Sequence, residues 1–285
     1  VSGGSDGAIN GRLTGGGVVG DFDGLVTFEG ASRDGYRAHS QADRFGVYAN
    51  AGWQPSANLD LRVYGMHVDN HQELAGALTR AQFEADPSQA NPSAVSGHYQ
   101  LNVKTDRVAA KGIWTGDGHQ RLEFGLSYED QSLYHPIVDK ILVDFDGPGP
   151  AQPVEVFSLL VDTDQRTWAG MVRYNVKLGD HDVLAGLNYA DTHDAGGNFR
   201  NDGGHRNGQT DIVDNRSDSV EVFLVDRWTF AQDWTLVYGG QGVSTSRDVS
   251  TTDVATGIVS NPKGDYSSFN PRLGALYALS ARNEL

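Results

Sequence analysis

The sequence contains no cysteine among its 285 residues, which excludes disulfide bonds, thiolate metal sites and cysteine nucleophiles. Basic residues are scarce as well. There are 22 Lys and Arg against 37 Asp and Glu, so the net charge is −15 and a nucleic-acid partner is not expected. No stretch approaches the roughly 18 to 20 uncharged apolar residues that a membrane-spanning helix requires, so a helical membrane protein is not expected either.

Catalytic signatures are missing too. The sequence has no GxSxG, P-loop, HExxH or Rossmann glycine motif. An enzymatic interpretation would depend on scattered carboxylates alone, and such carboxylates usually lie on a solvated surface. We therefore expect that the protein is not an enzyme and that it carries no cofactor and no catalytic metal.

Glycine, by contrast, is abundant. The 36 glycines make up about 13% of the chain, close to twice the usual share, whereas only 9 prolines are present and no triplet repeats. This composition excludes collagen and favours a strand-rich fold with many turns.

Apolar residues alternate with polar ones along most of the chain, as in strands that have one apolar face. In 122–129, for example, Leu122, Phe124 and Leu126 fall on one face, while glutamate, glycine and serine fall on the other. A helix would not separate them so cleanly. The pattern predicts about eleven strands, most of them longer than is usual in soluble proteins. They are expected at 6–18, 22–33, 42–53, 58–71, 103–114, 119–132, 164–177, 181–192, 217–230, 234–246 and 267–280.

The connections between these strands alternate in length. Tight turns follow residues 53, 114, 177 and 230. Short turns at one rim and long loops at the other are typical of a transmembrane β-barrel, so the sequence predicts an all-β, antiparallel transmembrane barrel that occupies 1–285 as one domain. The long connections are expected at about 72–102, 133–163, 193–216 and 247–266.

Aromatic residues test this prediction independently, because a bilayer interface collects amphipathic rings. One group lies beside the short turns and consists of Phe22, Trp53, Trp114, Phe230 and Trp234. A looser group lies towards the long loops and consists of Tyr36, Tyr128, Tyr134, Trp168 and Tyr189. Asp226 falls on the apolar face, where a charge is costly, so we expect it near a rim or a bulge. A soluble β-sandwich with aromatic residues capping its core is the alternative.

Several short segments, in order along the chain, resemble TonB-dependent outer-membrane receptors, and in particular the receptors for ferric citrate and related ferric siderophores. The likeness covers nearly the whole chain, and its order and spacing agree with the predicted strands and loops. The segments are GDFD at 20–23, SRDGYRAHS at 32–40, the stretch 44–53, ELAGALT at 73–79 with 82–92, YHPI at 134–137 and FNPRLG at 269–274.

The resemblance implies a partial barrel. Members of this family have an amino-terminal plug inside a 22-stranded barrel, so the chain is expected to begin beyond the plug and the first barrel strand and to end near the middle of the barrel. It implies a Gram-negative outer-membrane location, contact with lipid, and import of a ferric siderophore or another iron chelate, ferric citrate first, with energy that TonB delivers through the plug. Without a plug and with open edges, the chain is not expected to transport by itself.

Candidate ligand contacts lie in the connections expected at the external rim or at the strand ends beside them. External arginines could pair with carboxylates of an anionic iron chelate, and histidine or tyrosine could touch its surface. The plainer interpretation is that each is an ordinary solvent-exposed loop residue. The candidates are Arg33, Arg37, His39, His71, Tyr134, His135, Arg200, His205 and Arg206.

Some alternatives stay open at this stage. The Gly- and Asp-rich stretch 194–214 is expected to be a mobile loop, and its spacing does not match an EF-hand, so calcium binding there is undecided. A passive porin or adhesin-type barrel would explain the strands without energy from TonB. A soluble carbohydrate-binding sandwich would be extractable without detergent.

Overall fold

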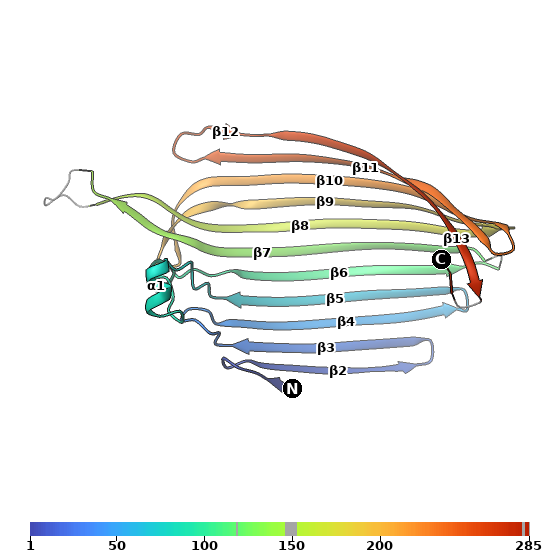
Figure 1. Ribbon diagram of the computed structural model, residues 1–285, viewed down its shortest axis with the longest axis horizontal. Helices are drawn as coiled ribbons and strands as arrows, with labels where there is room; N and C mark the ends of the chain where they lie inside the picture. Colours follow the sequence, from blue (N-terminus) through green and yellow to red (C-terminus); the bar gives the residue numbers. More distant parts are fainter. Residues whose placement is uncertain (118, 146–152, 281–282, 285) are drawn as a thin grey trace.

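The computed structural model describes residues 1–117, 119–145, 153–280 and 283–284. These residues form one antiparallel, 14-stranded sheet in which strands that follow one another along the chain pair side by side (Figure 1). The strands are β1 (Ser2–Gly3), β2 (Ile9–Val19), β3 (Phe22–Arg33), β4 (Ala42–Ser56), β5 (Leu59–Gln72), β6 (Asn102–Thr115), β7 (Arg121–Val143), β8 (Val154–Leu178), β9 (His181–Asp202), β10 (His205–Ala231), β11 (Trp234–Asp253), β12 (Val259–Ser260), β13 (Lys263–Ser280) and β14 (Asn283–Glu284). Two short helices, α1 (Arg80–Ala85) and α2 (Pro92–Ser96), lie between β5 and β6.

Every one of the eleven predicted strands is confirmed, but several are longer than predicted. The expected loop at 193–216 is wrong, because β9 and β10 continue through it and pair as far as Asp202 and His205. Gly203 and Gly204, with φ of 59° and 85°, make the turn between them. The same extension of β7 and β8 shortens the expected loop at 133–163. The alternation of apolar and polar residues ends where both faces of the sheet meet water. The hydrogen bonds between neighbouring strands continue beyond that point.

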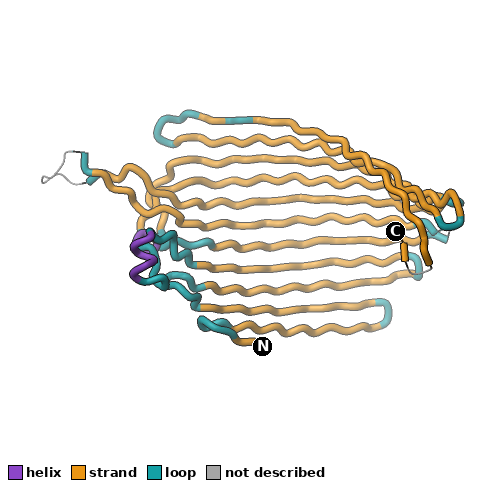
Figure 2. The backbone as a smooth tube through the Cα atoms, in the orientation of Figure 1, coloured by secondary structure: helices purple, strands orange, loops and turns teal. Residues whose placement is uncertain are grey.

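The two rims of the sheet differ as predicted. At one rim, called the short-turn rim, neighbouring strands are joined by tight turns, such as the one at Gly179 with φ 60°. At the other, called the long-loop rim, lie both helices and the longer connections (Figure 2). The sheet is curved, and among the described residues its edges at β1–β2 and β13–β14 do not pair with each other. The chain is therefore part of a barrel.

One face of the sheet, called the apolar face, carries the exposed large hydrophobic residues. Leu126 is 57% exposed and Val108 is 60% exposed on adjacent strands. At the short-turn rim, the rings of Phe22 and Trp53 stack at 5.9 Å, and those of Trp234 and Tyr277 lie 4.8 Å apart. Towards the long loops, Tyr128 and Trp168 meet at 4.6 Å. These rings border an apolar belt like that of a bilayer-spanning sheet.

Two members of the looser aromatic group do not join this border. Tyr36 lies in the connection between β3 and β4 and is 62% exposed. The hydroxyl of Tyr134 donates a hydrogen bond of 2.7 Å to the carbonyl of Gly204, so its ring is part of the packing at the long-loop rim.

The opposite face, called the polar face, is lined by ion pairs between neighbouring strands. Lys111 on β6 lies 2.9 Å from Glu123 on β7, and Arg107 lies 3.0 Å from Glu129 on the same two strands. Composition alone left open whether this face meets bulk water or a lumen. Its ion pairs fit a polar lumen wall.

Asp226 lies near a rim, as the sequence analysis expected. It is only 8% exposed, and its Oδ2 accepts hydrogen bonds of 2.6 Å from the hydroxyl of Tyr238 and 2.6 Å from Nδ1 of His181. The His181 ring stacks on Trp228, within the aromatic border of the short-turn rim. The charge on the apolar face is therefore solvated by two neighbouring side chains at the edge of the belt rather than in its middle.

In the described ranges, no helix has the length and apolar character needed to cross a membrane.

Candidate ligand-binding surface

The connection 73–101 is the largest structured element at the long-loop rim. Its helix α1 begins with a capping box, in which Oγ1 of Thr79 accepts from the amide of Gln82 and the Gln82 side chain accepts from the amide of Thr79. Helix α2 begins at Pro92 behind the N-cap Asn91. The sequence carries both start signals, yet neither helix was predicted, because these segments are too short to show helical periodicity.

Arg37 joins two connections to each other. Its guanidinium donates to the backbone carbonyls of Gln89, Gly76 and Ala75 at 3.0, 2.8 and 3.1 Å. Three directed bonds of one guanidinium hold the β3–β4 connection against 73–101. These donors are used within the protein, so Arg37 has few left for a ligand.

His39 also holds two connections together. Its side chain is 8% exposed, and Nε2 lies 3.0 Å from the carbonyl oxygen of Tyr99. His135 reaches the next carbonyl in the same way, since its Nδ1 is hydrogen-bonded to Gln100. Both histidines were predicted as ligand contacts, and both are placed in the packing between connections. Ligand contact remains a prediction for the parts of the two imidazole rings that stay accessible.

Asn201 is the central buried side chain at this rim, with no exposed surface. Its Nδ2 donates to the carbonyls of Gly97 and Val138 at 2.9 and 3.2 Å, and its Oδ1 accepts from the amide of Gly204 at 2.9 Å. Its own amide donates to Oγ of Ser158 at 3.0 Å. One side chain thus fastens 73–101 to β7 and to the β9–β10 turn.

A polar pocket of about 380 Å³ opens on the polar face at the long-loop rim. Its walls come from the ends of β8, β9 and β10. It is called the mouth pocket here, and it is lined by Glu155, Val156, Phe157, Ser158, Leu159, Asn198, Arg200, Thr210 and Asp211. Of the predicted candidates, Arg200 is the one that lines it. The other polar residues of the lining belong to no sequence motif, so sequence analysis could not identify them.

Arg206 lies on the opposite face from this pocket. Its guanidinium is 3.0 Å from Oδ2 of Asp162 and 5.2 Å from the centre of the Phe199 ring. Asp162 lies beyond the apolar belt, where burial raises the pKa of its carboxyl above the ordinary value and the positive charge of Arg206 opposes that rise.

We expect Arg206→Gln to raise the pKa of Asp162 further, because the opposing charge is lost while the burial remains. A raised pKa means that the folded state holds the proton more tightly than the unfolded chain. The free energy of unfolding then falls as pH rises from the ordinary aspartate pKa of 3.8 to the raised pKa of folded Asp162. The variant widens the pH range over which this fall occurs. A ¹³C carboxyl titration of Asp162 measures the change. Arg166→Gln, which removes the partner of Asp130, should leave that titration where it was.

The remaining candidates are spread along the rim. Arg33 ends β3, and His205 begins β10, and both are exposed. His71 on β5 lies 3.1 Å from Asp69 and is exposed as well. The nine predicted residues therefore do not form one cluster. Among the described residues, no group of three or more His, Asp or Glu side chains is arranged to hold a metal ion, which includes the stretch 194–214.

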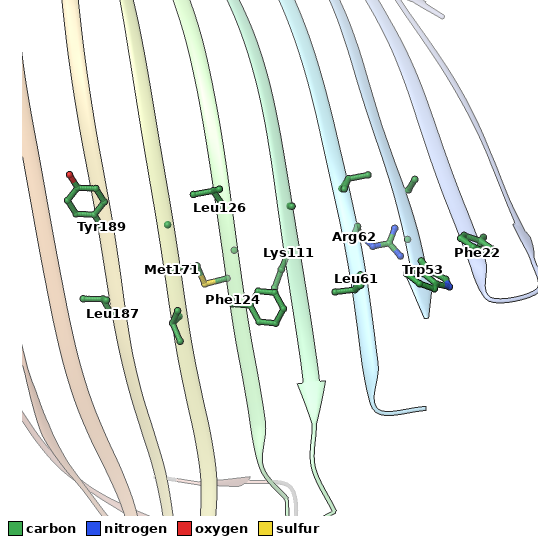
Figure 3. Close-up of a pocket in the computed structure, with 17 residues that line it drawn as sticks. Phe22, Trp53, Leu61, Arg62, Lys111, Phe124, Leu126, Met171, Leu187 and Tyr189 are labelled. Carbon is green, nitrogen blue, oxygen red and sulfur yellow. The ribbon is translucent and has the colours of Figure 1, made fainter. Parts of the chain in front are cut away.

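A larger hollow, of about 760 Å³, lies on the apolar face (Figure 3). It is lined by small residues such as Ala51, Ala110 and Gly170 and by larger side chains, including Phe124 and Leu126. Arg62 and Lys111 also line it, but their charged groups are paired with Asp23 and Glu123, so nearly all of its surface is apolar. The hollow is therefore part of the apolar face, whereas the smaller mouth pocket has polar and charged side chains in its lining.

No protein-family model matches the sequence, and no curated protein is significantly similar to it. Solved structures do match. The unliganded ferric citrate transporter FecA gives a TM-score of 0.75 at 16% identity, and the match covers 97% of this chain and 40% of FecA. The ferric yersiniabactin uptake receptor FyuA from Yersinia pestis gives 0.72 at 12% identity over 97% of this chain and 43% of FyuA. The copper transporter OprC gives 0.70 at 12% identity over 97% and 41%.

These matches establish the fold. The chain has the architecture of part of an outer-membrane receptor barrel, and its expected resemblance to TonB-dependent receptors is confirmed at that level. It spans 40–43% of the length of the three solved chains named above. The structural neighbours are transport receptors rather than enzymes.

Proposed function

We propose that the chain is part of a Gram-negative outer-membrane receptor that binds a ferric siderophore or a similar iron chelate and imports it with energy transduced by TonB. The observation that carries this proposal is the shared fold with FecA over 97% of the chain. The apolar belt with its two aromatic borders supports contact with lipid. The polar face ends in the mouth pocket, which supports capture of a polar ligand from the long-loop side.

The soluble sandwich fits the structure poorly. A sandwich buries the apolar faces of two sheets against each other, whereas the described residues form a single sheet whose apolar face is exposed. A passive barrel shares the belt, so energy dependence is the property that separates it from a receptor.

Uptake of ⁵⁵Fe by iron-starved cells tests the proposal, with a panel of ferric chelates supplied to cells with and without the gene. Gene-dependent uptake that stops when TonB is deleted is the expected result. Uptake that continues without TonB would indicate a passive barrel, and the absence of gene-dependent uptake for the whole panel would refute the proposal.

Filling the mouth pocket gives a sharper test of the binding surface. We expect Thr210→Trp to weaken chelate binding about tenfold or more, which corresponds to about 1.4 kcal/mol, because the indole occupies space that the ligand needs. Asn207→Trp is the matched control, since Asn207 is exposed and lies outside the pocket. Equal binding by both variants would place the ligand elsewhere.

A further inference from the structure

Most of the excess negative charge of the chain lies at the long-loop rim, where acidic residues outnumber Lys and Arg in the connections and strand ends. Many of the cations at this rim are also already paired with a carboxylate. These pairs are Arg166–Asp130, Lys140–Asp202, Arg206–Asp162, Arg216–Asp214 and Lys263–Asp248, at 3.2, 2.5, 3.0, 3.6 and 2.6 Å. Such pairs leave little net positive charge to attract an anion.

The carboxylates of the polar face near the mouth pocket have neutral partners instead. Glu155 accepts from Oγ of Ser158 at 2.6 Å. Asp194 accepts from Nδ2 of Asn215 at 3.2 Å.

Asp211 accepts from Oγ1 of Thr210 at 2.9 Å. Among the described residues, no salt bridge joins Asp194 or Asp211 to a cation. Glu155 lies close enough to Lys140 to help raise the pKa of that ammonium group, but Lys140 is itself paired with Asp202. Arg200 is the single Lys or Arg that lines the mouth pocket, and two carboxylates, Glu155 and Asp211, line it with Arg200. The pocket therefore carries net negative charge.

A concave surface lined by charges of one sign concentrates its field and attracts ligands of the opposite sign. An anionic chelate such as ferric citrate would meet Arg200 but would be repelled by the surrounding carboxylates. A complex of the same size with a free ammonium group would be attracted by them. These electrostatic forces act over about 8 to 10 Å at physiological ionic strength, a range comparable with the size of the pocket.

We propose that the mouth pocket selects a metal complex of net positive charge, such as an iron(III) hydroxamate chelate that carries a free ammonium group. This refines the proposed function, on which the identification of the cargo rests, and it reverses the preference for ferric citrate drawn from sequence resemblance. Glu155 and Asp211, which line the pocket, determine this specificity, and Asp194, farther along β9 on the same face, adds to the negative charge.

The sign of the field is measurable without a known ligand, because the chain has no cysteine and single thiols can be introduced cleanly. Val156 lines the mouth pocket and is 47% exposed, so Val156→Cys reports on the mouth. Gln232→Cys, in the exposed turn at the short-turn rim, is the matched control. Each thiol is treated with a trimethylammonium and with a sulfonate methanethiosulfonate reagent, in the protein as it stands in the outer membrane.

We expect the ratio of cationic to anionic reaction rates to be about tenfold higher at Val156→Cys than at the control in low salt, and the two ratios to converge in 1 M salt. Adding Glu155→Gln, Asp194→Asn and Asp211→Asn should bring the mouth ratio towards the control. The inference would be overturned if the rate ratio at the mouth does not exceed the ratio at the control in low salt. It would also be overturned if the higher ratio at the mouth is unchanged when all three carboxylates are neutralised.

The cargo itself is tested with two forms of one chelate. Desferrioxamine B binds iron(III) as a complex of charge +1, and its N-succinylated form gives a complex of charge −1 on the same scaffold. Tighter, salt-sensitive binding of the cationic form supports the inference. Equal or tighter binding of the anionic form overturns it and leaves the proposed function standing. If no ferric chelate is bound at all, the proposed function fails. The ratio of cationic to anionic reaction rates at the introduced thiols then decides alone the sign of the electrostatic field at the mouth pocket.

Discussion

Replacing Leu126 by arginine is expected to block stable insertion of the chain into a lipid bilayer. Leu126 lies on the apolar face of β7, is 57% exposed, and belongs to the belt between the aromatic borders. An arginine facing lipid near the bilayer midplane costs about 2–4 kcal/mol. The stability of a folded domain is itself only about 5–15 kcal/mol, so one such change removes a large share of it.

The neighbouring residue is the control. Ser127→Arg adds the same side chain one position along the strand, where it points to the polar face among groups such as Glu129. We expect this variant to insert nearly as well as the wild type. Folding into lipid vesicles, followed by the change in gel mobility that folded barrels show without heating, distinguishes the two. Equal loss of insertion by both variants would mean that the apolar face does not meet lipid.

The contrast between Leu126 and Ser127 also explains why the sheet was predictable. A sheet with one apolar face and one polar face requires alternation at every second residue, and this signal is local in sequence. The eleven strands and the short turns followed from it. The ends of β9 and β10 did not, because water on both sides of a ladder imposes no alternation, so residues 193–216 carried a loop-like composition although they form a hairpin.

The long-loop rim was less predictable because its ties join residues far apart in the chain. Arg37 contacts carbonyls 38 to 52 positions away, and Asn201 contacts Gly97 across 104 positions. No local pattern encodes such pairs. Residue type alone therefore could not separate Arg37, which holds connections together, from Arg200, which lines the mouth pocket.

Removing the Asn201 side chain is expected to release the connection 73–101 from the rest of the rim. In Asn201→Ala the carbonyls of Gly97 and Val138 and the amide of Gly204 all lose a partner. Each buried polar group left unpaired costs about 1–3 kcal/mol, so the local opening free energy should fall by at least about 2 kcal/mol. Hydrogen exchange at the Gly204 amide should rise by about thirtyfold, since each 1.4 kcal/mol is a factor of ten.

Asn207→Ala is the matched control, because it removes an asparagine side chain from the same rim but leaves the hydrogen bonds of Asn201 intact. Asn207 is exposed and donates one bond, of 3.3 Å, to Asp202, so its removal should change exchange at Gly204 little. Limited proteolysis within 73–101 should accelerate in Asn201→Ala alone, while β2 to β6 stay paired. If both variants exchange equally, the connection is held by its other ties, chiefly those of Arg37. Arg37, His39 and His135 would then be sufficient to hold 73–101 in place without the bonds of Asn201.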